Sequence, residues 1–579
     1  MQRSFLYFYI LILALVGCDI NHLWDAWYYD ACSLLVFLSV SFMMLNFVKV
    51  YENKVEKNFF GKSELFLYLF LFWSAASFYF SVNPELTSFP ALKSLGAIAF
   101  GLGLFLYLDN KDQLAQAWLV SYIFAGIHAS LGIMERFFPL FISGGLGPVQ
   151  GSESLFTNQN FYSCYLLIHI PVGLYLHFIA SRAFSKNLIG LGWIFILVAL
   201  GLSDSQAALI IGEIQIIIGI IYFLVRKEPE RAKLVGLAAA VAFLIYYNLV
   251  QLIPGGSILS LKTTSVTEPE GTWMLKHVGL RLRYWEGAWK IFCEHWLLGS
   301  GLWTFSELYP YTGLLETYTG SKFFHNPPHA HSVYFQTAAE SGLIGFVLLT
   351  CCLIYLFRGN IKQLVENKQK PLELNFFLLV SMAGFLLHNI SESNWFNSLF
   401  IYYFVFLIVS IEHLRRLSSN QPLKPVYLKK GLLLPSLLIV ALLVGYALVN
   451  FYKYNEIILS PISPDHNLIE YERGLSRAKN ICERCAGARY LSGLAKIDRY
   501  QMTKNKEFMN EAQKEFSEAL VRNPYNAKIH LIQGDIFSFL GKMKVARNSY
   551  KMAMKHPWYT LSAVDKIKNL RNLKESVGP

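Results

Sequence analysis

Charged residues are scarce in this sequence: they make up 16% of its 579 residues, whereas a soluble domain usually has about 25%. Hydrophobic residues reach 54%, above the roughly 45–50% of soluble proteins. This balance excludes a simple soluble enzyme. Cysteine is sparse too, because eight residues are too few for a disulfide scaffold and no two CxxC motifs have zinc-ribbon spacing. The sequence also has no convincing nucleotide-phosphate loop or DxD-type metal site.

The sequence contains many long hydrophobic runs. A run of about 20 apolar residues can cross a bilayer, and about twelve or thirteen such runs are present. They lie near residues 4–18, 31–48, 64–82, 91–108, 113–134, 161–180, 187–203, 206–226, 232–253, 332–357, 373–389, 395–411 and 431–450. The sequence therefore predicts an all-α fold, a polytopic membrane helix bundle in residues 1–452.

Lys and Arg are unevenly divided between the two sides of the predicted bundle. Alternate numbering of the loops places most of them on one side, for example Arg226 and Arg231, or Arg415 and Arg416. The side richer in basic residues is the cytoplasmic one. We therefore expect a cytoplasmic N-terminus, with a long loop, 254–331, and the C-terminal segment on the outer side.

Residues 453–579 form a separate polar, helix-favouring segment without a further span. Within it Phe516 and Ala519 recur 34 residues later as Tyr550 and Ala553. This period resembles that of tetratricopeptide repeats, which are stacked helical hairpins. An ordinary amphipathic helical bundle is the alternative.

Most of the net charge of +12 lies in this C-terminal segment. The charge is therefore no nucleic-acid signal, and it suits anionic lipid headgroups or an acidic protein partner. Cys482 and Cys485 in the same segment are compatible with a disulfide in an exported domain or with two free thiols.

The loop 254–331 is longer than a compact bundle needs, and such loops tend to carry function. It ends in a stretch that contains His325, His329 and His331. Clustered histidines can bind a metal, transfer protons or make structural hydrogen bonds. Two prolines interrupt the stretch, and no helix aligns the histidines, so we expect no metal.

Arg281 and Arg283 lie earlier in the same loop. On a helix, residues two apart point about 200° away from each other, so the two are not expected to bind one ligand symmetrically. A guanidinium group pairs well with phosphate oxygens, and near a bilayer such a phosphate would be lipid-linked. Snorkelling to lipid headgroups is the alternative.

Three ordered motifs carry a family resemblance. His331-Ser332, followed by Gly342-Leu343-Ile344-Gly345, resembles the signature of O-antigen ligases, O-antigen polymerases and bacterial protein O-oligosaccharyltransferases. Two earlier motifs are similar to segments of the same proteins: Arg281 and Trp285 with Gly299-Ser300-Gly301, and the Asn-rich run Phe156-Thr157-Asn158-Gln159-Asn160. The resemblance covers roughly 90–410.

One position departs from the family pattern. Ser205-Gln206 stands where the family usually has Ser-Arg, so an arginine expected to hold the donor diphosphate is missing. Gln206 donates hydrogen bonds but does not neutralise charge. Arg281, Arg283 or Arg136 could compensate.

The resemblance implies a metal-independent membrane glycosyltransferase that needs no cofactor. It would move a glycan from undecaprenyl diphosphate to an acceptor hydroxyl at the periplasmic face of the bacterial inner membrane. His331 is the implied base, because a histidine titrates near neutral pH. Arg281 or Arg283, assisted by Gln206, would stabilise the leaving diphosphate. The remaining candidates for substrate binding are Asn160, His329 and Ser332. Glu340 could orient a polar group or serve helix packing.

Three acceptors compete within the family: a lipid A–core sugar for a ligase, the growing chain for a polymerase, and a protein hydroxyl for an oligosaccharyltransferase. We favour the ligase-like function, with the C-terminal segment available to recruit a protein partner. A transporter is the alternative from another class, but charge inside the spans is sparse, with Glu213 the clearest case. A catalytically inactive scaffold is the third possibility.

Overall fold

The computed structural model describes residues 2–16, 28–52, 60–138, 152–156, 158–252, 272–314, 326–366, 373–418, parts of 442–458, and 468–576. These residues form helices and loops, and none of them lies in a strand, which confirms the all-α prediction. The helices before the C-terminal segment are α1 (Gln2–Val16), α2 (Tyr28–Glu52), α3 (Lys62–Ala76), η1 (Ser77–Tyr79), α4 (Pro84–Tyr107), α5 (Lys111–Phe137), α7 (Gln159–Ile179), α8 (Ala183–Leu202), α9 (Gln206–Val225), α10 (Pro229–Leu252), α11 (Thr272–Glu294), α12 (Phe305–Leu308), η2 (Tyr309–Thr312), α13 (Val333–Glu366), α14 (Leu374–His388), η3 (Asn394–Phe396) and α15 (Ser398–Ser418).

Among the described residues, seven helices are long and apolar enough to cross a membrane. They are α4, α5, α7, α8, α9, α10 and α13, and shorter apolar helices lie at Ser33–Val48 and Leu374–His388. Each predicted span except 431–450 coincides with a helix, and 431–450 lies largely outside the described residues. The chain is a multi-pass membrane protein.

The apolar runs form helices because a helix satisfies its own backbone hydrogen bonds, which water cannot do inside a bilayer. Helix α4 packs on α2, α3 and α15 and is mostly buried, whereas α9 and α10 expose many apolar side chains. Asparagines cap several helix starts: Asn83 for α4 and Asn110 for α5 accept backbone N–H groups of the first turn.

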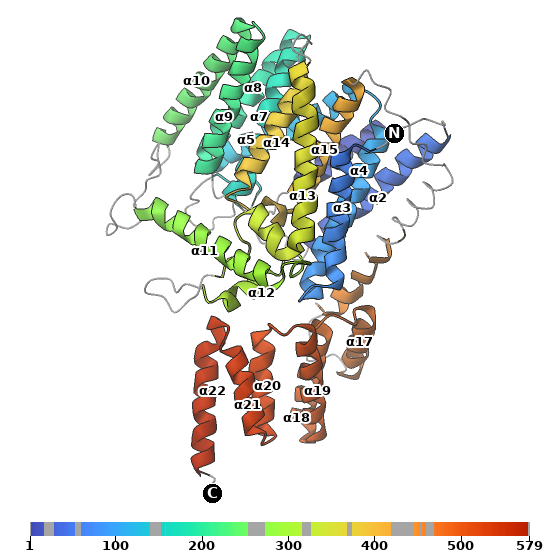
Figure 1. Ribbon diagram of the computed structural model, residues 1–579, viewed down its shortest axis with the longest axis vertical. Helices are drawn as coiled ribbons and strands as arrows, with labels where there is room; N and C mark the ends of the chain where they lie inside the picture. Colours follow the sequence, from blue (N-terminus) through green and yellow to red (C-terminus); the bar gives the residue numbers. More distant parts are fainter. Residues whose placement is uncertain are drawn as a thin grey trace.

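The bundle has two distinct ends, and α11, α12 and the C-terminal helices lie at one of them (Figure 1). We call this the loop end; it includes the segment 389–397 between α14 and α15. Helices α9 and α15 start at the loop end, so Arg226 and Arg416, which follow or close them, lie at the opposite end. The predicted sidedness requires this separation of the basic turns from the long loop.

Helix α13 breaks at Gly342, whose φ of 65° and ψ of −170° are not helical. The break frees backbone groups, and the segment 296–301 binds them. Ser300 N–H donates to Ala339 O and Gly301 N–H to Glu340 O, both at 3.0 Å. Gly299 and Gly301 also have positive φ, and their backbones lie against the break. The glycines of the two sequence motifs are therefore close together in the fold.

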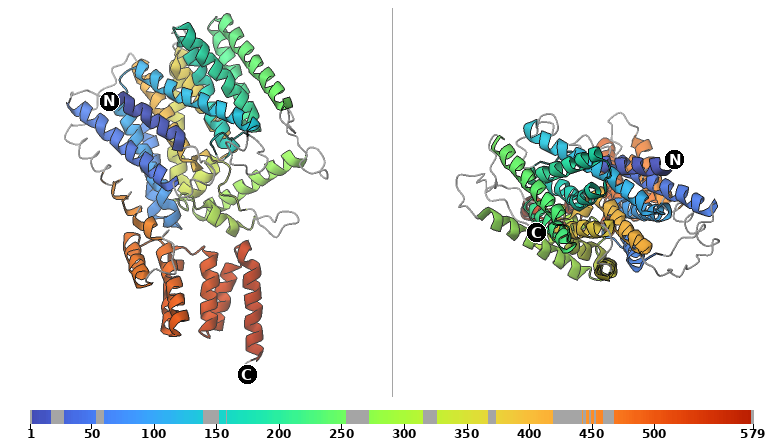
Figure 2. Two further views of the ribbon diagram at one scale, coloured as in Figure 1. Left: turned by 180° about the vertical axis from the view of Figure 1, so that it is seen from behind. Right: turned by 90° about the horizontal axis from the view of Figure 1, so that it is seen from above.

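The C-terminal segment consists of α17 (Leu468–Ile481), α18 (Gly487–Thr503), α19 (Glu507–Arg522), α20 (Ala527–Phe539), α21 (Met543–Ala553) and α22 (Pro557–Ser576). Consecutive helices pack on each other and stand in a row below the bundle (Figure 2). Phe516 packs against Gly493, and Tyr550 packs against Gly534. The tetratricopeptide assignment stays a prediction. Cys482 and Cys485 form a disulfide, which resolves the choice that the sequence left open.

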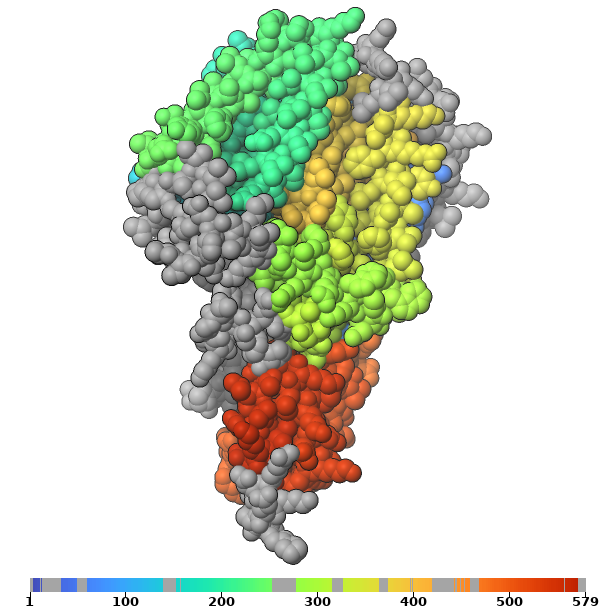
Figure 3. Space-filling view, turned by 60° about the vertical axis from the view of Figure 1, so that its left-hand side comes forward, coloured from blue at the N-terminus to red at the C-terminus, as the bar shows by residue number. Residues whose placement is uncertain are grey.

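The C-terminal helices dock on α12 of the loop end, and Figure 3 shows the two parts in contact. Glu307 of α12 accepts hydrogen bonds from the side-chain amides of Asn523 (2.6 Å) and Asn83 (2.8 Å). The hydroxyl of Tyr311 donates to the carbonyl of Tyr525. Long-range contacts therefore join α12, the start of α4 and the C-terminal helices.

A second contact joins the same two parts at Glu85 in the first turn of α4. Its carboxylate accepts from the backbone N–H of Gly487 at 2.9 Å and from the hydroxyl of Tyr454 at 3.1 Å. Two half-buried carboxylates, those of Glu307 and Glu85, thus hold the C-terminal helices against the bundle.

Candidate active site

His331 and Glu392 form the centre of a polar cluster at the loop end. Nδ1 of His331 lies 3.1 Å from Oε1 and 3.3 Å from Oε2 of Glu392. The two loops that carry them are joined by Ser332, whose backbone N–H donates to Ser393 Oγ at 2.9 Å. The His331 side chain remains 23% exposed, whereas that of Glu392 is 1% exposed. A buried carboxylate thus holds an imidazole that a substrate can reach.

The carboxylate of Glu392 accepts several hydrogen bonds. The side-chain amide of Asn160 donates at 2.9 Å and the backbone N–H of Ser393 at 2.9 Å. Burial alone would raise the pKa of Glu392, but the charge of His331 and its hydrogen bond, with smaller contributions from His329 and Ser393, bring the pKa below its usual range. Glu392 is therefore ionised at neutral pH and accepts a proton-bearing nitrogen.

His329 lies beside His331, with ring centroids 4.3 Å apart. Its Nδ1 is 3.6 Å from Glu392 Oε1. Burial lowers the pKa of His329 to about 4, although the charge of Glu392 acts in the opposite direction. His329 is thus neutral at pH 7, and its Nδ1 accepts the backbone N–H of His331 at 3.3 Å.

The predicted site residue Asn160 links Glu392 to the start of α9. Its side-chain oxygen accepts the hydroxyl of Ser205 at 2.8 Å, so the serine of Ser205-Gln206 enters the network. Gln206 itself is exposed at the first position of α9. The structure therefore brings Asn160 into the cluster and leaves the Gln206 side chain at the surface beside it.

Arg136 supplies a positive charge close to Gln206. Its guanidinium group lies 3.4 Å from Asp204 Oδ2, and its side chain is 15% exposed. Asp204 has a positive φ of 58° and directly precedes Ser205. A cation from α5 thus lies next to the position at which the resemblance expects an arginine.

Helix α11 separates the two candidate arginines of the long loop. Tyr284 stacks on His331 with ring centroids 5.4 Å apart, and Trp285 Nε1–H donates to His331 O at 3.4 Å. Arg281 is half-buried one turn earlier on the same face, and its charge acts on His388. Arg283 is exposed. The segment is helical, as the 200° argument assumed, and Arg281 is the arginine on the side of His331.

Ser332, another predicted site residue, is 1% exposed and contributes the backbone N–H that donates to Ser393 Oγ.

Glu340 accepts the backbone N–H of Phe305 at 3.1 Å and the amide of Gln336 at 2.7 Å. Gln336 in turn accepts the backbone N–H of Ala330, between the two histidines, at 2.6 Å. Glu340 thus fixes the histidine loop through Gln336, an orienting role that the sequence left open.

His329, His331 and Glu392 place possible metal-ligand atoms within 4.8 Å of one another. Two imidazoles and a carboxylate suit a divalent transition metal such as zinc. The carboxylate, however, already accepts two N–H donors, from Asn160 and Ser393, so the cluster is also complete as a hydrogen-bonded unit.

Glu392 and Tyr284 are the main residues of the candidate site that sequence reasoning missed, and Ser205 was noted only as the neighbour of Gln206. A signal was present for Glu392, because the polar run from His388 to Asn394 separates two apolar spans, and five of its seven residues are buried. Buried polar residues at a membrane surface favour a functional site.

Comparison with known proteins identifies a family match in part of the chain. Residues 191–350 match the family model described as O-antigen ligase; this range contains Gln206, Arg281 and His331 and ends before Glu392. A candidate polysaccharide ligase of Rickettsia conorii is 27% identical over 210 residues, which is 36% of this chain and 47% of that protein. The match thus spans about half the length of this curated relative. These findings support a general glycan-transfer or ligase function, and residues 191–350 carry the O-antigen ligase family segment that the motifs indicated.

Proposed function

We propose that this protein is an O-antigen ligase-like glycosyltransferase that moves a glycan from undecaprenyl diphosphate to an acceptor hydroxyl at the periplasmic face of the bacterial inner membrane. The observation that carries the proposal is the contact of His331, which lies in the segment that matches the family model, with the ionised Glu392 outside that segment. The disulfide of the C-terminal helices supports their placement in the periplasm, because disulfides persist in oxidising compartments.

The reaction needs a base for the acceptor hydroxyl. Because Glu392 is ionised, it accepts a proton-bearing Nδ1 of His331, and Nε2 is then the basic nitrogen. Nε2 takes the hydroxyl proton while the acceptor oxygen attacks the anomeric carbon of the donor glycan. The bond from that carbon to the diphosphate oxygen breaks, and undecaprenyl diphosphate leaves.

The leaving diphosphate needs positive charge and hydrogen-bond donors. We assign this role to Arg281 on α11 and to Arg136 beside Asp204, and the exposed Gln206 adds an amide donor. Arg283 is exposed on another face of α11, so we assign it no direct contact with the donor. Of the two arginines of α11, our proposal therefore retains Arg281 for the donor diphosphate.

Replacement of His331 by Ala tests the function. Glycan transfer in membranes should fall by about 10²-fold or more, the usual contribution of a general base. His177→Ala is the matched control, because His177 lies near the end of α7 away from the site and binds the carbonyl of Lys186. Full transfer by His331→Ala at normal expression would remove His331 from the mechanism.

Two further experiments define the reaction. Chelation with EDTA should leave transfer unchanged; loss of transfer with recovery on added zinc would assign the His329–His331–Glu392 cluster to a metal. Deletion of the gene, followed by analysis of surface glycans, identifies the acceptor. A ligase defect leaves lipid A–core without its glycan, a polymerase defect shortens the chains, and an oligosaccharyltransferase defect removes glycan from proteins.

A further inference from the structure

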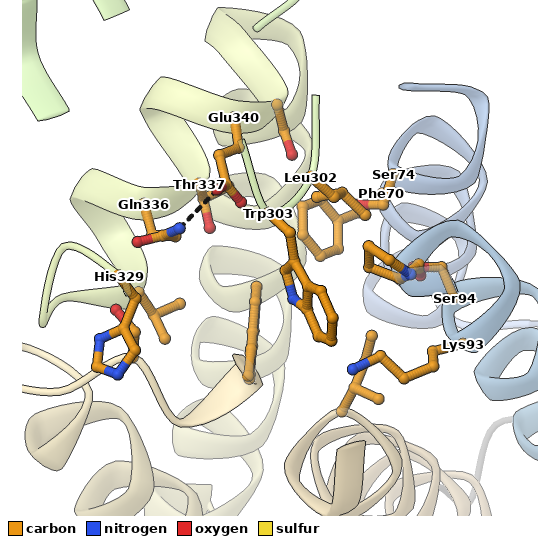
Figure 4. Close-up of a pocket in the computed structure, with 16 residues that line it drawn as sticks. Phe70, Ser74, Lys93, Ser94, Leu302, Trp303, His329, Gln336, Thr337 and Glu340 are labelled. Carbon is orange, nitrogen blue, oxygen red and sulfur yellow. Dashed lines mark hydrogen bonds between the residues drawn. The ribbon is translucent and has the colours of Figure 1, made fainter. Parts of the chain in front are cut away.

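A cavity adjoins the His331 site between α3, α4, the first part of α13 and the segment 299–304. His329 and Ser393 line it, and both also contact Glu392, so the cavity opens beside the base. Figure 4 shows Trp303 in its middle, with Lys93 on one side and Gln336 on the other.

Lys93 brings a positive charge into this cavity. It is 3% exposed, and its Nζ lies 4.3 Å from the ring centroid of Trp303 and 5.2 Å from that of Phe89. Lys93 is nine residues into α4, about 13 Å from the helix start at a rise of 1.5 Å per residue. Ionisable residues at such depth in a membrane protein are rare and usually mark the path of a substrate.

Two polar groups of the cavity lining have no hydrogen-bond partner among the described residues. They are the indole N–H of Trp395 and the hydroxyl of Ser341, and both atoms are buried. Buried donors almost always have a partner, so a ligand with oxygen atoms would complete them. Gln336 and Glu340, by contrast, are already fixed by each other at 2.7 Å.

The lining combines aromatic faces, unpartnered donors and one cation. The C–H faces of a sugar ring pack against the electron-rich face of an indole, and its hydroxyl oxygens accept from N–H and O–H groups. Lys93 adds a partner for a carboxylate or phosphate. A purely apolar ligand such as a lipid tail would leave the indole N–H of Trp395 and the hydroxyl of Ser341 without a hydrogen-bond partner.

The position of the cavity favours the acceptor over the donor. The Asn160 and Ser205 contacts lead from Glu392 toward Arg136, where the donor diphosphate is proposed to lie. His329 and Ser393 lie on the cavity side. We propose that the cavity is the acceptor subsite and that it takes a sugar ring carrying a carboxylate or phosphate, recognised by Lys93, Trp303 and Trp395. This inference rests on the proposed function for its assignment to the acceptor.

Ligand binding tests the proposal without any transfer assay. Saturation-transfer NMR on the purified full chain in detergent should show binding of glucuronate at millimolar concentration and binding about tenfold weaker for glucose, since an ion-paired hydrogen bond contributes about that factor. Lys93→Met should abolish the preference, and Lys93→Arg should keep it. Trp395→Phe should weaken binding of both sugars, because it removes the indole N–H and reduces the aromatic face.

The control is Lys62→Met, since Lys62 also lies over an aromatic ring, that of Tyr355 at 5.1 Å, but at the opposite end of the bundle. It should bind like the wild type. Thermal unfolding of each variant separates lost binding from lost folding. Equal binding of the two sugars, no binding of glucuronate, or a preference that survives in folded Lys93→Met would overturn the proposal.

Two more measurements distinguish the source of the negative charge. Glucose 6-phosphate should compete with glucuronate, and inorganic phosphate at equal concentration should not, because it lacks the ring. In nanodiscs, phosphatidylglycerol should displace glucuronate no better than phosphatidylcholine; selective displacement would assign the cavity to a lipid headgroup and overturn the proposal. Failure here leaves the His331→Ala result intact, so the two proposals fail separately.

Discussion

The carboxylate of Glu392 lies 3.1 Å from Nδ1 of His331, although the two residues are 61 positions apart in the sequence. The chain returns to the same point of the membrane surface after the two helices α13 and α14. In the proposed mechanism, the contact joins the base to the carboxylate that fixes its proton-bearing nitrogen, as in other base–carboxylate pairs.

Glu392→Gln should lower the rate of glycan transfer by about 10²- to 10⁴-fold. The amide keeps the shape of the carboxylate, but it loses the charge and can donate to Nδ1, which would place the proton on the wrong nitrogen. Initial rates in membranes of matched expression measure the effect. Glu228→Gln, in the α9–α10 turn at the opposite end, is the control. A rate within twofold of the wild type would show that Glu392 serves only the fold.

Arg136→Gln should raise the KM for the lipid diphosphate donor by about tenfold, the contribution of one charge-assisted hydrogen bond, with a smaller effect on kcat. A second change, Gln206→Arg, returns the cation to α9 and should restore much of the lost affinity. Donor titrations of the single and double variants measure both effects. The exposed Arg182, in the α7–α8 turn, provides the control Arg182→Gln. No rescue by Gln206→Arg would contradict the proposed compensation.

Gly342→Ala should destabilise the protein more than Gly313→Ala. Gly342 has a backbone conformation that is essentially restricted to glycine, which costs another residue about 1–3 kcal/mol, and a Cβ there would lie 2.5 Å from the backbone of both Leu297 and Gly299. Gly313 also has a positive φ, 76°, but its Cβ would meet open space, so the cost is about 1 kcal/mol. Thermal unfolding in detergent compares them, and equal losses would refute the steric argument.

His329 should make stability depend on pH between 6.5 and about 4. Its pKa is lowered from 6.5 to about 4 in the folded protein, so below pH 6.5 the unfolded chain binds a proton that the folded chain excludes. Stability therefore falls as the pH falls through this window, by at most about 3 kcal/mol. His329→Gln should flatten that part of a plot of unfolding temperature against pH. An unchanged slope would mean that His329 is protonated in the folded protein.

Glu307 and Asn523 should control the docking of the C-terminal helices. Burial raises the pKa of Glu307 despite the hydrogen bonds of Asn523 and Asn83, so its stabilising contribution is complete below pH 4.5 and is lost as the pH rises through the raised pKa. At neutral pH, Glu307→Gln should therefore slow limited proteolysis between the two parts, and Asn523→Ala should accelerate it. Met502→Ala, at an exposed side chain of α18, is the control. Faster cleavage of Glu307→Gln would reverse the sign of this argument.

The sequence was sufficient for the helices and for part of the site. Apolar runs of membrane length predict helices reliably because the bilayer leaves the backbone no other partner, and all predicted spans within the described residues are helical. His331 and Arg281 followed from motif resemblance. Glu392 did not, because its pairing depends on how α13 and α14 return the chain, a long-range relation that local patterns do not contain.

The break in α13 also depends on a long-range contact that local sequence patterns do not contain. The run 332–357 predicts one continuous span, and glycines inside membrane helices are common. The helix breaks at Gly342 because the segment 296–301 offers backbone partners for the freed groups. Likewise, the sequence shows only that Gln206 stands where the family usually has an arginine. The structure adds that a different cation, Arg136, lies beside Asp204, two residues before Gln206.

Glu340 connects two parts of the molecule that the sequence separates. On one side it holds Phe305 of α12, the short helix whose Glu307 binds Asn523 of the C-terminal helices; on the other it holds Gln336 and thereby the backbone between the histidines. A protein bound to the C-terminal helices would thus act, through Glu307, α12 and Glu340, on the loop that carries His331. Binding to the C-terminal helices would then be coupled to the position of the His331 side chain.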